Sequence, residues 1–298
     1  MPGPDTKHAP DTVGPAVRQA AADLRQAGIA QAGDDARRLA AAALGLSTAQ
    51  LLARPEQPIG PEQAARLAQY IARRRRREPV SRILGERAFH GRSFAISPAT
   101  LDPRPDSETL IAAALELAGP ERGCCAPFDI LDVGTGSGCL LLTLLCELPA
   151  ATGLGTDISE AALATARANA DRLGVGQRVR WCMADALQGI GGPFDMLVCN
   201  PPYIPSAEIA RLEPEVRLFD PPSALDGGAD GLDLFRRIVR VAPAVIPNGW
   251  LILEVGHDQA DAVADLLRGQ APAIDRDSIV FYPDVAGRRR GVAARTRN

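Results

Sequence analysis

Residues 198–204 read Val-Cys-Asn-Pro-Pro-Tyr-Ile, and this stretch decides how the chain is arranged. It continues an apolar run that begins at Phe194 and has the composition of a buried strand. Proline has no N–H to donate to a sheet and fixes its own φ, so the strand must end at Asn200. Because a residue before proline is kept out of the helical region, Asn200 and Pro201 are both held extended. The pattern predicts a stiff turn at the carboxyl end of a strand.

Such a turn suits a reaction in which a planar NH2 group attacks. An amide or aryl nitrogen is a poor nucleophile because its lone pair is delocalised. The Asn200 side-chain oxygen and the Pro201 carbonyl can accept both N–H bonds, aim the nitrogen and stabilise the positive charge that develops there. The ring of Tyr203 can stack on the flat substrate group. Asn-Pro also opens many ordinary turns, so a strand end without a function stays open as an alternative at this point.

The composition is that of an ordinary globular chain. Its 298 residues, 46% apolar and 23% charged, suffice for one large domain and one small domain. The net charge of -3 creates no general attraction to nucleic acid or membranes. No apolar run is long enough to span a membrane, and the polar, proline-rich start has no signal core, so we expect a cytoplasmic protein. The six cysteines lack metal-ligand spacing, and we expect buried free thiols and no metal.

The first part of the chain has a helical pattern. We expect a disordered tail over residues 1–12 and a small helical domain over residues 13–85. Gly45 is placed to end the second helix, Ser47 to cap the third, and Pro61 to open the fourth. The arginine run 73–77 ends this fourth helix, where positive charge complements the helix dipole. A solvated helix end and a contact for an acidic partner both remain open for that run.

The helical pattern is followed by two short alternating runs around Gly91, which predict a hairpin linker over residues 86–104. Arg104 stands between two prolines, and Asp106 or Ser107 is placed to cap a helix over residues 108–117. A structural proline loop would also tolerate an arginine there.

Strands and helices then alternate through residues 105–298, which we expect to form the large domain. This alternation predicts a mainly parallel sheet covered on both faces, closed by an antiparallel hairpin at its edge. The expected strands are residues 130–133, 153–156, 179–183, 194–199, 250–255, 278–282 and 290–295.

Polar residues end successive strands of this predicted sheet. The first strand leads into the glycine-rich loop 134–138, the second ends at Asp157, the third at Asp185 and the fourth at Asn200. Ligands of open α/β folds bind at this carboxyl edge, where a carboxylate after the second strand accepts from ribose hydroxyls. Asp185 is placed to accept from an adenine amino group. An adenosine with a reactive group facing Asn200 fits, and S-adenosylmethionine provides one in its electrophilic sulfonium methyl. A helix cap at Asp157 and a turn at Asp185 are the structural alternatives.

Four motifs together resemble one protein family. They are Asp-Val-Gly-Thr-Gly-Ser-Gly at 132–138, Asn-Pro-Pro-Tyr at 200–203, Pro-Arg-Pro-Asp-Ser-Glu at 103–108 and Asp-Gly-Gly-Ala-Asp-Gly-Leu at 226–232. The combination resembles the bacterial peptide-chain release factor N5-glutamine methyltransferases of the HemK type, which are class I S-adenosylmethionine-dependent enzymes. The resemblance implies a Rossmann-like domain with a seven-stranded, mainly parallel sheet, joined by a β-hairpin to a small helical domain that recognises the substrate.

The resemblance also implies an activity and a set of site residues. Members methylate the glutamine of the Gly-Gly-Gln loop of release factors, so we expect release factors as partners, a monomer, and neither membrane nor stable nucleic-acid binding. The catalytic residues expected are Asn200, Pro201 and Tyr203. The cofactor-binding residues expected are Gly134, Thr135, Gly136, Ser137, Gly138, Asp157, Asp185, Ala186 and Asn200. The substrate-binding residues expected are Asn200, Pro201, Pro202, Tyr203 and Arg104.

Three positions depart from the family pattern: Ala186 replaces a larger side chain, Asp102 an aliphatic one, and His90 a Tyr or Trp. Methylation of a ribosomal-protein glutamine, methylation of an RNA or DNA base, and a cofactor-binding scaffold without catalysis remain as alternatives. The intact Asn200 turn argues against the scaffold, and a base methyltransferase would need a basic, aromatic-lined surface that this sequence offers only around residues 73–77 and 288–290.

Overall fold

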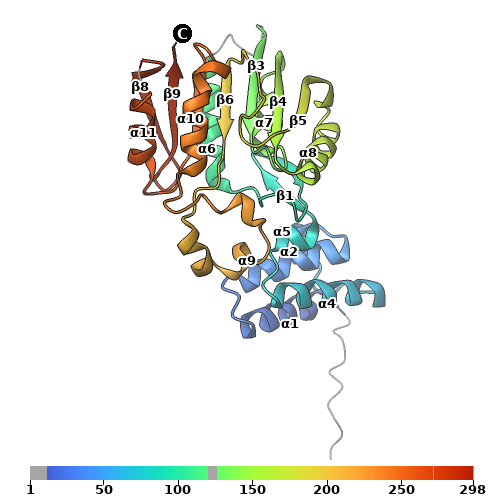
Figure 1. Ribbon diagram of the computed structural model, residues 1–298. Coiled ribbons are helices and arrows are strands. Elements are labelled where there is room, and N and C mark those ends of the chain that lie inside the picture. The colour runs from blue at the N-terminus through green and yellow to red at the C-terminus, as the bar shows by residue number, and fades with distance from the viewer. Residues whose placement is uncertain (1–11, 120–125, 271, 298) are drawn as a thin grey trace, which may run out of the picture. The chain divides into compact units, whose positions relative to one another are not determined.

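The computed structural model describes residues 12–119, 126–270 and 272–297 (Figure 1). These residues form two compact units. The first contains the described residues up to Gly85 together with Pro214–Phe219, and the second contains Glu86–Glu213 and Asp220 onward. Most of the expected tail, residues 1–12, lies outside the described residues, and Thr12 forms an isolated bridge with Pro58. No helix in the described part of the chain is long and apolar enough to cross a bilayer.

The first unit is built from five helices around an alanine- and leucine-rich core. They are α1 (Val13–Gln26), α2 (Ala32–Leu44), α3 (Thr48–Ala53), α4 (Pro61–Arg75) and α5 (Val80–Leu84). The predicted punctuation is confirmed: Gly45 takes the left-handed conformation after α2, and Pro61 is the first residue of α4. Ser47 caps α3 through its side chain, which accepts from the backbone N–H of Gln50.

A short segment from far along the sequence completes this unit. The helix α9 (Pro214–Arg217) carries Glu215, whose carboxylate accepts from Arg74 at 3.0 Å and from Arg77 at 2.8 Å. Arg74 also donates from Nε to Asp35 at 2.7 Å, and both side chains are only 9% exposed. Burial, the largest single cause, raises the pKa of Glu215, but the backbone hydrogen bond and the contacts with Arg74 and Arg77 together outweigh it and lower the pKa. The arginine run that ends α4 is therefore partly internal rather than a purely solvated helix end.

The second unit contains a seven-stranded sheet of order β5-β4-β3-β6-β7-β9-β8 (Figure 1). The strands are β3 (Phe128–Val133), β4 (Ala151–Asp157), β5 (Val179–Met183), β6 (Met196–Cys199), β7 (Trp250–Glu254), β8 (Ile274–Pro283) and β9 (Arg289–Thr296). The first five run parallel, while β9 pairs antiparallel with both β7 and β8. This confirms the mainly parallel sheet and its antiparallel edge pair.

Helices cover both faces of this sheet. They are α6 (Glu108–Ala118), α7 (Cys139–Glu147), α8 (Glu160–Arg172), α10 (Asp233–Val245) and α11 (Ala260–Arg268). On β3, Ile130 packs into the core cluster of α6 and α7, whereas Leu131 packs into that of α10 and α11. Because neighbouring strand residues point to opposite faces, a strand buried on both sides must be almost continuously apolar, as β3 and β6 are.

The expected hairpin is present as β1 (Glu86–Phe89) and β2 (Arg92–Ala95), paired antiparallel. The capping prediction before α6 is partly wrong. Ser107 ends the short 3-10 helix η1 (Pro105–Ser107) and stands at the N-cap position of α6, but its side chain makes no capping bond. That hydroxyl is engaged elsewhere, in the site described below.

Removing the Asp35 carboxylate tests the ionic core of the helical unit. In Asp35→Ala, the free energy of unfolding should fall by about 3–5 kcal/mol, because Arg74 is left buried with part of its charge unpaired. Urea denaturation followed by circular dichroism measures the loss.

The neighbouring Asp34→Ala is the matched control, since Asp34 pairs with Arg37 at the surface and should contribute at most about 1 kcal/mol. Equal decreases in the free energy of unfolding of the two variants would show that the buried Asp35–Arg74 pair contributes no more than the surface pair.

Candidate active site

A cavity of about 470 Å³ opens at the carboxyl ends of the parallel strands. Most of the predicted site residues meet there, although they come from five separate segments of the chain. Those that line it are Arg104, Gly134, Thr135, Gly136, Ser137, Asp157, Asp185, Ala186, Asn200, Pro201 and Pro202. Among the described residues of the predicted set, Gly138 and Tyr203 do not line it.

The glycine-rich loop after β3 forms one wall. Gly134 and Gly136 have φ values of 71° and 55°, a region that residues with a Cβ rarely enter. The backbone N–H of Thr135 donates to the carbonyl of Thr156 at 2.8 Å, which holds the loop against β4. Gly138 has a packing role instead: a Cβ there would lie 2.8 Å from the Leu142 side chain. At Gly134 and Gly136, where a side chain would project, the backbone itself borders the cavity.

Asp132, at the start of this loop, is a buried carboxyl with 1% exposure. Burial raises its pKa to about 7, against the hydrogen bond from Thr135, which lowers it. The Thr135 hydroxyl donates to Asp132 Oδ2 at 2.6 Å. When ionised, this carboxyl places negative potential beneath the glycine-rich loop, which favours a positively charged ligand group there.

Asp157 ends β4 and joins two elements of the site. Its Oδ2 accepts from the Gly136 N–H at 2.9 Å and its Oδ1 from the Ser159 N–H at 2.9 Å. Each carboxylate oxygen has a second lone pair, so the group can still accept from ribose hydroxyls. The alternative that Asp157 caps the following helix is wrong, because the N-cap of α8 is Ser159, whose hydroxyl accepts from the Ala162 N–H.

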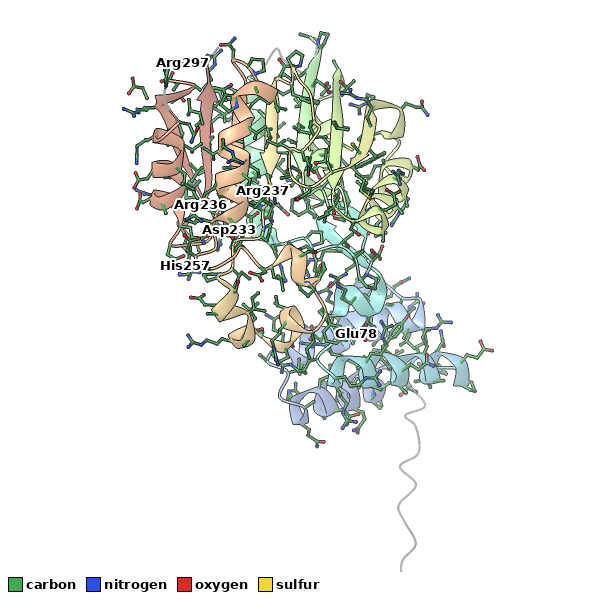
Figure 2. The ribbon with its side chains drawn as sticks, in the orientation of Figure 1. Glu78, Asp233, Arg236, Arg237, His257 and Arg297 are labelled. Carbon is green, nitrogen blue, oxygen red and sulfur yellow. The ribbon has the colours of Figure 1, made fainter. Side chains whose placement is uncertain are left out.

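The third strand contributes Asp185 and Ala186. Asp185 forms an ion pair of 2.8 Å with Arg237, which stands on α10 (Figure 2). Ala186 has a φ of 54°, an uncommon conformation for alanine. Its small side chain contributes little to the cavity wall.

Asn200 lies at the centre of the predicted turn, at the end of β6. Its Nδ2 donates to the Ser107 hydroxyl at 3.2 Å, and Ser107 is 2% exposed. With Nδ2 engaged, Oδ1 is the atom that Asn200 offers as an acceptor to a ligand. Asn200 is thus oriented by a residue that the sequence pattern indicated only as a helix cap.

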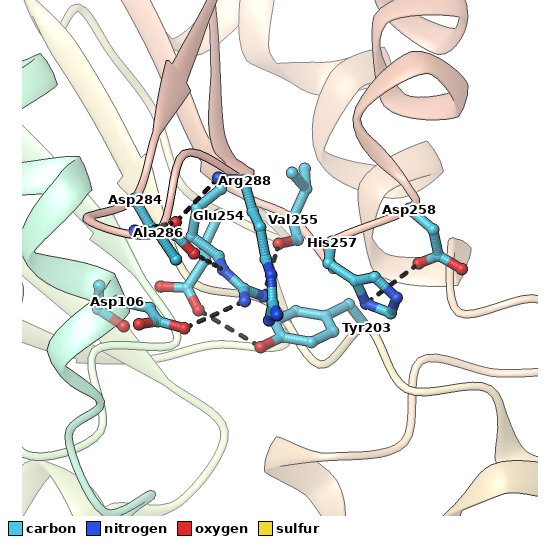
Figure 3. A network of polar contacts seen from close by, with 12 residues as sticks. Asp106, Tyr203, Glu254, Val255, His257, Asp258, Asp284, Ala286 and Arg288 are labelled. Carbon is cyan, nitrogen blue, oxygen red and sulfur yellow. Dashed lines mark hydrogen bonds and ion pairs between the residues drawn. The ribbon is translucent and has the colours of Figure 1, made fainter.

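Tyr203 is held behind the cavity wall rather than in it. Its hydroxyl lies 3.5 Å from Glu254 Oε1 (Figure 3). Its carbonyl accepts from Gln259 Nε2 at 2.9 Å. Burial, followed by the Glu254 charge, raises the pKa of Tyr203 to about 12. The proposed stacking of Tyr203 on a substrate stays a prediction, and in this structure the ring supports the turn from beneath.

Glu254 is the main site residue that sequence reasoning missed. It ends β7, is 1% exposed, and burial raises its pKa to about 7. A signal was present, since Glu254 is an acid at the end of an otherwise apolar strand, the same rule that identified Asp157. Around it lie Arg290, 3.1 Å from Asp106, and Asp284, 3.7 Å from Arg290 (Figure 3).

Arg104 and the departures from the family pattern lie upstream of the turn. Arg104 pairs at 2.6 Å with Asp220, which also accepts from the backbone N–H of Asp102 at 3.2 Å. Asp102 is buried and lies 3.7 Å from Arg87. His90 turns the hairpin with a φ of 45°. Neither His90 nor Asp102 is among the described residues that line the cavity.

The glycine-rich loop 226–231 is joined directly to the Asn200 turn. Ile204 donates to the Leu225 carbonyl at 3.0 Å and accepts from the Gly227 N–H at 2.9 Å. Gly231 has a φ of 76°, and a Cβ there would lie 2.3 Å from the Tyr203 carbonyl oxygen. The loop thus needs glycine both for its conformation and for close approach to the turn.

Among the described residues, no group of three or more His, Cys, Asp or Glu is placed to hold a metal. Cys199 is buried, and Cys139 is partly exposed as a residue although its thiol is buried; Cys146 and Cys182 are partly exposed free thiols, so the expectation of burial is wrong for these two. The other two cysteines lie outside the described residues.

Two family models match this chain. Residues 15–85 match the model described as PrmC N-terminal domain, and residues 121–212 match the model described as Methyltransferase small domain. The first match falls on the helical unit and the second on the part of the sheet that carries the glycine loop and Asn200.

Curated relatives match over nearly the whole chain. A release factor glutamine methyltransferase of Bradyrhizobium diazoefficiens is 47% identical over 281 residues, 94% of this chain and 93% of that protein. A protein of the same name from Moorella thermoacetica is 41% identical over 280 residues, 93% of this chain and 95% of that protein. The crystal structure of a methyltransferase from Pyrococcus furiosus shares the fold, with a TM-score of 0.51, 16% identity, and coverage of 70% of this chain and 91% of that chain.

Gly231→Ala tests the attachment of the loop to the turn. We expect it to lower the free energy of unfolding by about 1–3 kcal/mol, because alanine is strained at this φ and its Cβ clashes with the Tyr203 carbonyl. Thermal unfolding measures the effect. Gly191→Ala is the control, as a Cβ at Gly191 meets nothing within 4 Å; a loss of the same size there would refute the steric explanation.

The buried Glu254 carboxyl predicts a pH-dependent stability. Its folded pKa of about 7 exceeds the ordinary 4.5, so the folded state holds the proton more tightly. The associated stability is complete below pH 4.5 and is lost as pH rises through about 7. Relative to wild type, Glu254→Gln should therefore gain stability between pH 4.5 and 8, by on the order of 3 kcal/mol.

Chemical denaturation at several pH values measures this difference, which removes the contributions of all groups common to both proteins. The exposed Glu208→Gln is the control and should show no such trend. A difference that is independent of pH would mean that folding does not shift the pKa of Glu254.

Proposed function

This chain belongs to the release factor glutamine methyltransferase family, and from that premise we propose that it methylates the N5 amide nitrogen of the glutamine in the Gly-Gly-Gln loop of peptide-chain release factors. One observation supports this most directly. Asn200 lines the cavity with Nδ2 committed to Ser107, which leaves Oδ1 to accept a hydrogen from a substrate amide. A turn that accepts from a planar NH2 group suits a carboxamide substrate.

The residues present fit S-adenosylmethionine as methyl donor. The exposed backbone of Gly134 and Gly136 and the buried Asp132 suit its charged amino-acid part, while Asp157 has lone pairs for the ribose hydroxyls. Asp185 and Ala186 line the side proposed for the adenine. When bound there, this cofactor supplies an electrophilic methyl group.

The protein's own part in the reaction is positioning and electrostatic stabilisation. Oδ1 of Asn200 and the carbonyl of Pro201 accept the two amide hydrogens and turn the nitrogen toward the cofactor side of the cavity. They also stabilise the positive charge that grows on nitrogen, and both are fixed before the reaction by the proline-locked turn. No strong base is required before attack, because the amide proton becomes acidic only as the new bond forms.

The pairing of the basic clusters argues against a nucleic-acid substrate. Arg73, Arg74 and Arg77 pair with acidic residues of the helical unit. In the other cluster, Arg289 pairs with Asp261 and Arg290 with Asp106. These ion pairs neutralise much of the charge that phosphate binding would need. We therefore propose that the helical domain of residues 13–85 recognises the protein substrate. We also propose that the enzyme is a monomer that acts in the cytoplasm, where release factors act.

Asn200→Ala tests the function and its mechanism together. Turnover should fall by about 10²–10³-fold, comparable to losing one preorganised polar contact in a transition state. Affinity for S-adenosylhomocysteine, measured by titration calorimetry, should stay near that of wild type, because the glycine loop and Asp157 are untouched.

Mass spectrometry of a purified release factor provides the readout, as a single added methyl group on the loop glutamine. A release factor with that glutamine changed to alanine is the substrate control. Methyl transfer to total RNA, or to the altered release factor, would contradict the proposed substrate, whereas unimpaired turnover in Asn200→Ala would contradict the mechanism.

A further inference from the structure

We propose that Glu254 is a positioning residue that sets the direction of a hydrogen-bond chain through Ser107 to Asn200, and so decides which end of the Asn200 amide faces the substrate. The inference deepens the proposed function and rests on it for the identity of the substrate. It concerns a group that neither binds the substrate nor lines the cavity among the described residues.

Sheet register places Glu254 beside the turn. On the parallel strands β6 and β7, Cys199 is the partner of Leu253. The next residues along the two strands are Asn200 and Glu254, so these two stand side by side at the carboxyl edge of the sheet. Glu254 is 1% exposed, and its Oε2 is buried without a hydrogen-bond partner among the described residues. Burying a carboxyl oxygen without a hydrogen-bond partner lowers the stability of the fold, so such a group calls for a functional explanation.

Ser107 connects the two side chains. Its hydroxyl accepts from Asn200 Nδ2 at 3.2 Å, and it is close enough to the Glu254 carboxyl to act against the rise in the pKa of that group. A hydroxyl has one hydrogen to give, whereas an ionised carboxylate can only accept. With Glu254 ionised, Ser107 gives its hydrogen to Glu254 and must accept from Asn200. The amide then turns Nδ2 toward Ser107 and Oδ1 toward the substrate.

Protonation of Glu254 removes this constraint. A protonated carboxyl can donate to Ser107, and the serine hydrogen is then free to point at Asn200 Oδ1. The amide reverses and offers Nδ2, a donor, to a substrate NH2 group that also donates. The site thus requires ionised Glu254, although burial favours the protonated form.

The groups around Glu254 come from several elements. Arg290 of β9 favours its ionisation and Asp106 of η1 opposes it, while Tyr203 contributes a second hydrogen bond. The thiols of Cys139 and Cys199 also lie within its electrostatic reach, and burial raises both of their pKa values far above neutrality, to about 12 for Cys139. The pKa of Glu254 itself is raised to about 7. Asp132 of β3, which pairs with Val198 on β6, also has a pKa raised to about 7 by burial, so the comparison with Glu254→Gln is what assigns a titration to Glu254.

Two variants and two readouts test the proposal. At saturating cofactor and release factor, kcat of the wild type should rise with pH through about 7. Glu254→Gln and Ser107→Ala should lose this dependence and, at pH 8, lower kcat by up to about 10²-fold through misplacement of the amide. The affinity for S-adenosylhomocysteine should not change, and the exposed Glu208→Gln should keep the wild-type profile.

The second readout needs no substrate. The side-chain NH2 resonances of Asn200, assigned by their absence in Asn200→Ala, should shift with pH through about 7 in wild type and stay constant in Glu254→Gln. A titrating resonance that persists in Glu254→Gln, or a wild-type resonance that does not titrate, overturns the proposal. Failure of the wild type to methylate a release factor at any pH would instead overturn the proposed function, while the resonance still decides the role of Glu254.

Discussion

The parallel pairing of β3, β6 and β7 is the constraint on which the rest of the structure depends. It brings the glycine loop, Asn200 and Glu254 to one edge, although more than a hundred residues separate the first from the last. Two consecutive prolines then prevent the central strand from continuing past that edge. The carboxyl edge of the sheet therefore forms one wall of the cavity, where the Asn200 amide is held in place.

Two carboxyl groups are buried at this edge of the sheet, although burial destabilises an ionised carboxyl. Asp132 and Glu254 are both about 1% exposed, and desolvation raises the pKa of each to about 7. Burying a carboxyl in this way costs stability, which an apolar residue of similar volume would not. One carboxyl stands beneath the loop proposed to hold a cationic cofactor, and the other stands behind the turn proposed to hold an amide. Both buried carboxyls lower the stability of the fold beside the proposed site, as expected where function and packing compete.

Much of this arrangement could be predicted from the sequence, because it is written in local signals. Apolar runs and prolines predict the strands, and capping residues predict the helix ends. Polar residues at the ends of strands predict Asp157 and Asn200 as site residues. Glu254 carries the same local signal as Asp157, an acid at the end of an apolar strand, but its partner Tyr203 lies about fifty residues away and no local pattern reports that pairing. The role of Ser107 could not be predicted, because its contact is with Asn200, about ninety residues away. Serine before a helix is usually a cap, but here its hydroxyl is used by the tertiary structure instead.

The small helix that carries Glu215 has a consequence for how this architecture can be rearranged. Since Pro214–Phe219 is part of the helical unit, the polypeptide passes between the two units three times rather than once. The unit is thus not a simple amino-terminal appendage. A chimera that exchanges the first eighty-five residues between relatives would have to carry this hexapeptide with it, or leave Arg74 and Arg77 facing a foreign sequence. The two segments are expected to have diverged together, as a single module encoded in two places.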